Sequence, residues 1–165
     1  MAWTSGLFAV HWQRTLGGDA KTYVNRYLID LSSVSNSIAL YSNTATPVYY
    51  STAATEWAAY TTTNEASGTG YTAKGVALTA GYSQTNTLTT ATGVLLYSHG
   101  AVTWTTATIT ASGALWFNDA VTAGDTGGVA DAAFVGVAFG ATYTSTAGSF
   151  VVTPAAGGVF SIDFY

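Results

Sequence analysis

The sequence predicts an all-β protein, a jelly-roll-like β-sandwich, on three observations. Thr, Val and aromatic residues are abundant, and these residue types favour pleated sheet over helix. Hydrophobic residues make up 48% of the 165-residue chain, which is enough for one domain with a core. About nine short β-rich runs alternate with turn residues, at spacings near the 8–12 residues that are typical of sandwiches and barrels.

The expected elements follow one another along the chain. Residues 37–41 form the first strand, residues 55–60 fit a short helix with Thr55 as N-cap, and a further strand covers about residues 75–80. Around Gly136, the apolar run at 133–139 indicates a half-buried strand. The other expected strands cover 87–91, 94–97, 102–105, 108–117, 150–153 and 159–164, and residues 118–128 form a loop.

The first 31 residues are the least sheet-like part of the chain. They hold three of the four basic side chains, at Arg14, Lys21 and Arg26. This predicts an N-terminal arm (1–31) that reaches a neighbouring subunit, attached to a single β domain (32–165). A strand or helix that caps the same domain is the alternative.

Charged residues are scarce, at 7% against a usual level of about 25%. With a net charge of −4, the surface has little self-repulsion and suits a subunit packed against copies of itself. No basic cluster is present to bind nucleic acid, no apolar run approaches the ~20 residues that span a bilayer, and there is no cysteine. We expect neither nucleic acid nor membrane as a partner.

Residues 64–78, NEASGTGYTAKGVAL, have the most unusual order in the chain. Glycines at 68, 70 and 75 predict a backbone that turns sharply or is approached closely by another segment. The glycines together with Lys74 are partly similar to a phosphate-binding loop. That motif, however, requires Gly-Lys-Ser/Thr at the start of a helix, whereas here Lys74 comes before Gly75 and a β-branched run. We therefore expect a glycine-rich turn that leads into a strand.

No set of catalytic residues emerges. His11 and His99 have no partner motif, so His99 is expected to lie in a turn, and Glu56 with Glu65 is a weak glycosidase pair. Aspartates at 119, 125 and 131 could hold Ca²⁺, but their spacing fits no known loop template, which favours a solvated loop. No catalytic residue, cofactor or metal is predicted. Four aromatic residues could form a carbohydrate platform or, more often for strand positions, pack in a core or an interface: Trp57, Tyr60, Trp104 and Trp116.

Two segments carry a resemblance to a known family. NEASGTGYTAKGVAL and, later, VTWTTATITASGALWF resemble in order and rough spacing the segments N-E-x-x-G-T-G-Y-T-x-G-G and V-T-W…T-I-T-A of small virion structural proteins of tailed bacteriophages. The similarity covers about residues 32–165. Lys74 stands where that family more often has glycine, and Ser112-Gly113 replaces its usual charged residues.

The resemblance implies a non-enzymatic component of the virion, either a capsid decoration protein or a minor tail protein. As a decoration protein it would bind the major capsid protein and copies of itself, as a trimer at local threefold positions on the capsid exterior. The predicted contact residues are Trp3, Phe8, Trp12 and Tyr27 on the arm and Tyr71 at the glycine-rich turn. The alternative is a tail or fibre-associated protein that binds carbohydrate on the host surface.

Overall fold

The computed structural model describes residues 4–8, 36–47, 49, 60–78, 94–119 and 130–163. The chain is all-β in these ranges, as the composition predicts, and no helix in them is long and apolar enough to cross a membrane. The strands are β1 (Gly6–Leu7), β2 (Asn36–Tyr41), β3 (Val76–Ala77), β4 (Val94–Tyr97), β5 (Val102–Asn118), β6 (Ala132–Val152) and β7 (Phe160–Asp163).

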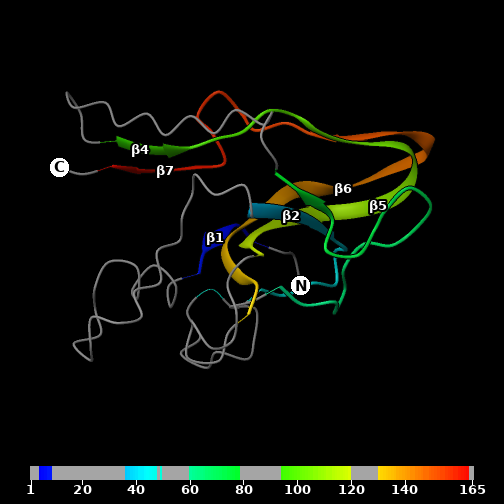
Figure 1. Cartoon of the computed structure of the whole chain (residues 1–165), viewed down its shortest axis with the longest axis horizontal. Coiled ribbons are helices and arrows are strands. Elements are labelled where there is room, and N and C mark those ends of the chain that lie inside the picture. The colour runs from blue at the N-terminus through cyan, green and yellow to red at the C-terminus, as the bar shows by residue number, and fades with distance from the viewer. Residues whose placement is uncertain are drawn as a thin grey trace.

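The described strands form two antiparallel sheets. Five strands make one sheet in the order β1-β6-β5-β2-β3, and β4 pairs with β7 in the other. The long partners β5 and β6 run through both layers of the molecule. Figure 1 shows them bending together at the end away from β4 and β7, so that their outer halves fold back over the five-stranded sheet. This hairpin therefore connects the two sheets.

Register shifts between β5 and β6 accompany the bend. Ala111 pairs with Tyr143 but Gly113 pairs with Ala138, so β6 has the extra residues across this step and forms the bulge. A second irregularity lies near Thr106 and Ala147, whose φ angles of 51° and 49° are left-handed. Bulges increase local twist and let strands turn a corner between sheets, which explains how one hairpin serves two layers.

The hairpin corrects two sequence predictions. Residues 102–105 and 108–117 are one continuous strand, β5, and the expected strands at 133–139 and 150–153 are joined in β6. The predicted strands ended where the alternation of buried and exposed side chains is interrupted. In β5, Thr105 and Thr106 are both exposed at the bulge, and in β6 most residues from Gly140 to Ser149 are exposed and small or polar. The expected strands at 37–41, 94–97 and 159–164 are confirmed in essence by β2, β4 and β7. Residues 55–59 of the expected helix at 55–60 lie outside the described residues, and so does the expected strand at 87–91.

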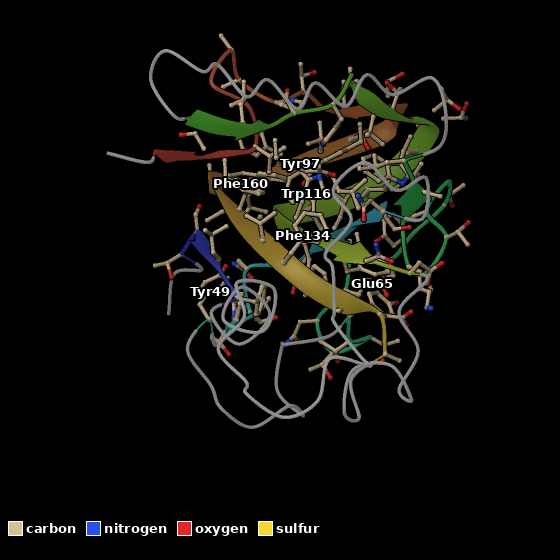
Figure 2. The ribbon with its side chains drawn as sticks, turned by 60° about the vertical axis from the view of Figure 1, so that its left-hand side comes forward. Tyr49, Glu65, Tyr97, Trp116, Phe134 and Phe160 are labelled. Atoms are coloured by element: carbon tan, nitrogen blue, oxygen red, sulfur yellow. The ribbon has the colours of Figure 1, made fainter. Side chains whose placement is uncertain are left out.

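The five-stranded sheet is covered on both faces. β2 is buried along its whole length, with Ile38 and Leu40 in one hydrophobic cluster and Ala39 and Tyr41 in the other. Full burial on both faces explains why this strand has a continuous apolar centre in place of an alternating pattern. Between the sheets, the Tyr97 ring lies 5.4 Å from both the Phe134 and the Phe160 rings by centroid distance, and Figure 2 shows Trp116 beside them.

The described part of the N-terminal segment belongs to the sheet. β1 pairs with β6 through Gly6–Gly136 and Leu7–Val135, and the Phe8 side chain is 1% exposed. Tyr49 packs against Phe8 at 4.8 Å between ring centroids, and its hydroxyl donates to the Thr4 carbonyl oxygen at 2.6 Å. Residues 4–8 are thus held by the chain's own core.

Candidate functional site

The glycine-rich segment lies against the large sheet and contacts both β2 and β5. The Ala66 N–H donates to the Leu40 carbonyl oxygen at 2.8 Å, and the Thr108 N–H donates to the Thr69 carbonyl oxygen at 2.9 Å. A Cβ at Gly75 would overlap the Ile38 carbonyl oxygen, and one at Gly68 would overlap that of Thr108. The segment then leads into β3, so the prediction of a close-approach turn followed by a strand is confirmed.

Glu65 is the hub of the polar contacts in this segment. Its Oε1 accepts hydrogen bonds from the Tyr71 hydroxyl and the Lys74 backbone N–H, both at 2.8 Å. Its Oε2 accepts a hydrogen bond from the Tyr60 hydroxyl. Both carboxylate oxygens are therefore engaged within the chain, and Figure 2 shows Glu65 apart from the aromatic cluster between the sheets.

Tyrosine hydroxyls around Glu65 are held in their protonated form. Burial raises the pKa of Tyr71 and that of Tyr60 well above the usual value, and the nearby Glu65 carboxylate adds to both shifts. The Tyr71 hydroxyl also accepts the Leu40 N–H at 2.9 Å, so one phenol bridges Glu65 and β2. Tyr41, whose hydroxyl donates to the Thr61 carbonyl oxygen at 2.6 Å, has a pKa raised by burial as well.

Lys74 connects this segment to both ends of the 119–131 loop. Its Nζ lies 2.9 Å from Asp119 Oδ1 and 2.8 Å from Asp131 Oδ2, and 5.7 Å from the centroid of the Tyr60 ring. The hydrogen bond from Lys74 lowers the pKa of Asp119, while burial raises that of Asp131. The Lys74 pKa is raised by the same two carboxylates. An ammonium group thus occupies the position between these carboxylates where a Ca²⁺ ion would have to lie, and Asp125 is outside the described residues.

These contacts make a structural clamp. Both oxygens of Glu65 accept hydrogen bonds from neighbours within the chain, and Glu56, its partner in the weak glycosidase pair, lies outside the described residues. The phosphate-loop alternative fails on geometry, since β3 and no helix follows Gly75, and the Lys74 side chain is bound to two carboxylates.

His99 is a buried structural residue. Its Nε2 accepts the Trp116 indole N–H at 2.9 Å, and its Nδ1 lies 2.6 Å from the Gly100 carbonyl oxygen, so Nδ1 carries the proton. Burial lowers the His99 pKa, which keeps the ring neutral and able to accept. His99 lies in the loop between β4 and β5, in keeping with the expected loop position, but it is only 5% exposed, and no feature of the sequence indicates that burial.

The predicted aromatic platform is not assembled by the described residues. Trp104 and Trp116 are 4% and 2% exposed and lie in the core, and Trp57 lies outside the described residues. A buried indole cannot stack on a sugar in solvent, so their packing in the core, the more common case for strand aromatics, is confirmed.

The predicted contact residues fall in different places. Phe8 is buried in the core, and Tyr71 is half-buried, with its ring 6.1 Å from Trp104 by centroid distance. Within the chain, burial leaves Phe8 no surface for another subunit. Trp3, Trp12 and Tyr27 lie outside the described residues, and their role as contacts stays a prediction.

The outer half of the β5–β6 hairpin is a surface that the sequence analysis missed. Its outward side chains alternate with buried ones and carry no charge: Thr103, Thr105, Thr108 and Thr110 on β5, and Thr144, Ser149 and Val151 on β6. Thr110 and Thr144 hydrogen-bond across the strands at 3.0 Å. The sequence does contain a signal for this uncharged surface, because residues 75–118 and 132–162 include no Asp, Glu, Lys or Arg.

Comparison with known proteins finds no match to this chain among family models, curated proteins or solved structures.

Proposed function

We propose that the protein is a non-enzymatic structural component of a tailed-bacteriophage particle, a decoration protein that binds the major capsid lattice and stabilises it. The observation that carries the proposal is the uncharged exposed surface of the β5–β6 hairpin. Charged groups are depleted at the centres of protein–protein interfaces. A surface of this kind suits permanent contact with protein more than free exposure to water.

The internal clamp suits the same role. Glu65, Lys74 and two tyrosines tie the glycine-rich segment to the sheet and to the 119–131 loop, which gives a rigid body. A rigid body loses little conformational freedom on binding, so more of the contact energy remains as affinity. Many identical contacts, each burying on the order of 1,000–2,000 Å², would then resist internal pressure together.

The finer parts of the proposal are a jelly-roll topology, an N-terminal arm and a trimer at local threefold positions. Residues 1–31 supply the arm, with Trp3, Trp12 and Tyr27 as its contact residues. Because residues 6–7 pair with β6 and Phe8 is buried, deletion of the whole segment would expose the core. Trp12→Ala combined with Tyr27→Ala is the cleaner test of the arm.

The deciding experiment separates phage heads from tails and quantifies this chain by mass spectrometry against the major capsid protein. Tens to hundreds of copies with the heads are expected. If the chain is found only with tails, in a few copies, the decoration role is wrong and the minor tail protein that binds host carbohydrate takes its place. In purified particles, the Trp12→Ala and Tyr27→Ala variant is expected to show reduced occupancy, and undiminished occupancy would rule out the arm.

A further inference from the structure

One edge of the large sheet is open in the described part of the chain. β1 pairs with β6 only at Val135 and Gly136, and the Ser5 hydroxyl accepts the Ala138 N–H at 2.9 Å. Beyond Ala138, no described strand pairs with this side of β6, and Gly140, Ala141 and Thr142 are all exposed. Open edges present unpaired backbone groups to any partner that can use them.

Two aromatic rings lie at this open edge. Phe139 and Tyr143 flank the bulge at a centroid distance of 6.3 Å in an edge-to-face arrangement. Phe139 is half-buried and packs on the hydrophobic core, while Tyr143 is 53% exposed, the most exposed large hydrophobic side chain among the described residues. We call Phe139, Tyr143 and the exposed segment between them the β6 rim. Phe139 is anchored in the core and contacts the Tyr143 ring, so the rim presents exposed aromatic area beside a side chain that has little freedom left to lose on binding.

The charge distribution identifies the partner. The β6 rim has no charged residue within β6, nor on β5 opposite it. Such a surface gains nothing from an acidic or basic partner, and the complementary surface is one that is also free of charge. A second copy of this chain presents that surface, because its own residues 75–118 and 132–162 contain no Asp, Glu, Lys or Arg. Identical copies can meet there without like-charge repulsion.

We propose that the β6 rim is a self-association surface, on which a second copy of this chain docks. The tyrosine ring and the open backbone edge of one copy are buried against the uncharged β6 rim of the next, in a closed symmetric oligomer. The inference rests on the proposed structural role for its biological meaning, but self-association of the purified chain can be measured without any phage particle. A chain that associates in solution yet is absent from particles would overturn the proposed function and leave this inference standing.

The test uses the full-length chain and measures its molar mass by light scattering and sedimentation over a wide range of concentrations. The wild type is expected to form an oligomer, and Tyr143→Lys is expected to raise the dissociation constant at least tenfold, because a lysine from each copy would be buried in the contact. Val151→Lys is the matched control. Val151 is 50% exposed on the same strand but pairs with exposed Thr103, whereas Tyr143 pairs with buried Ala111, so the two side chains lie on opposite faces.

Three outcomes decide the matter. Weakened association in Tyr143→Lys with wild-type association in Val151→Lys supports the β6 rim. A wild type that is monomeric at every concentration overturns the proposal, as does equal weakening by both variants. Because both positions are exposed, both variants are expected to fold, and unchanged circular dichroism and thermal midpoints would verify that. If Tyr143→Lys fails to fold, Ala141→Lys, at another exposed position on the rim, replaces it, and wild-type association in that variant would contradict the proposal.

Discussion

Gly75 is a position at which the fold requires glycine for two reasons, its backbone angle and the lack of space for a side chain. It has a φ angle of 67°, and a Cβ there would overlap the Ile38 carbonyl oxygen. Gly140 has a similar φ of 78° but open space around it. Left-handed backbone costs an alanine roughly 1–2 kcal/mol. We therefore expect Gly140→Ala to lower the free energy of unfolding by about that amount, and Gly75→Ala to lower it by clearly more, because the overlap is with backbone.

Urea unfolding of both variants measures the difference. Equal losses of stability would contradict the prediction, since they would mean that the close approach of Gly75 to β2 contributes nothing beyond its backbone angle. The prediction separates two roles of glycine that a sequence alone cannot separate.

Lys74 combines a favourable contact with an unfavourable backbone angle. Its φ of 70° is strained for a non-glycine residue, and its side chain makes two ion pairs while 46% exposed. Exposed ion pairs each contribute about 0–1 kcal/mol, which is close to the strain that glycine would remove. Lys74→Gly is therefore expected to change stability by less than about 1 kcal/mol, whereas Lys74→Ala, which keeps the strain and loses the ion pairs, is expected to be the less stable variant.

Thermal unfolding at low and high salt checks this balance. The stability of the wild type should fall slightly as salt screens the ion pairs, and that of Lys74→Gly should not. A large loss in Lys74→Gly would show that the clamp between the glycine-rich segment and the 119–131 loop is stronger than an exposed ion pair.

Two buried tryptophans differ in one hydrogen bond. The Trp116 indole N–H donates to His99 Nε2, whereas the indole N–H of Trp104 has no partner among the described residues. Replacing either residue with phenylalanine removes packing, but only Trp116→Phe leaves a buried acceptor unsatisfied, which costs about 1–3 kcal/mol. Trp116→Phe is therefore expected to destabilise the protein more than Trp104→Phe, as measured by urea unfolding. The opposite order would show that the His99 contact contributes little.

At the scale of elements, strand identity was predictable and strand length was not. β2, β4 and β7 follow from short apolar or β-branched runs, because the core selects those residues locally. β5 and β6 were each divided in two, because a bulge breaks the alternation of side chains without ending the strand. Sequence patterns report which face a residue occupies, whereas a bulge depends on the partner strand.

The clamp around Glu65 could be predicted only in part. The spacing of glycines identified a turn that approaches another segment closely, and Gly75 against β2 confirms it. The partners of Glu65 could not be found, because Tyr60 and Tyr71 reach it through the tertiary fold and no motif marks them. Likewise, Lys74 and Asp119 lie 45 residues apart in sequence, and only the hairpin brings them together.

At the scale of the whole molecule, one consequence of the fold is a collective sensitivity to alkaline pH. Burial raises the pKa of four tyrosines above the usual value near 10: Tyr41, Tyr60, Tyr71 and Tyr97. A group with a raised folded-state pKa holds its proton more tightly in the folded state, so its contribution is complete below pH 10. That contribution is lost as the pH rises above 10, where the unfolded chain releases the proton first. Each buried tyrosine adds a slope of up to about 1.4 kcal/mol per pH unit.

With four such groups, we expect the free energy of unfolding to fall steeply above pH 10, and the folded state to be lost roughly one to two pH units higher. Tyrosinate absorbance followed against pH should show these phenols ionising together with unfolding, and ionisation of all tyrosines while the fold persists would contradict the prediction.

Tyr71→Phe provides the control. It removes the hydrogen bonds to Glu65 and from Leu40, so it should be less stable than the wild type at pH 7. Its stability should nevertheless fall less steeply above pH 10, since one of the groups that link folding to protonation is gone.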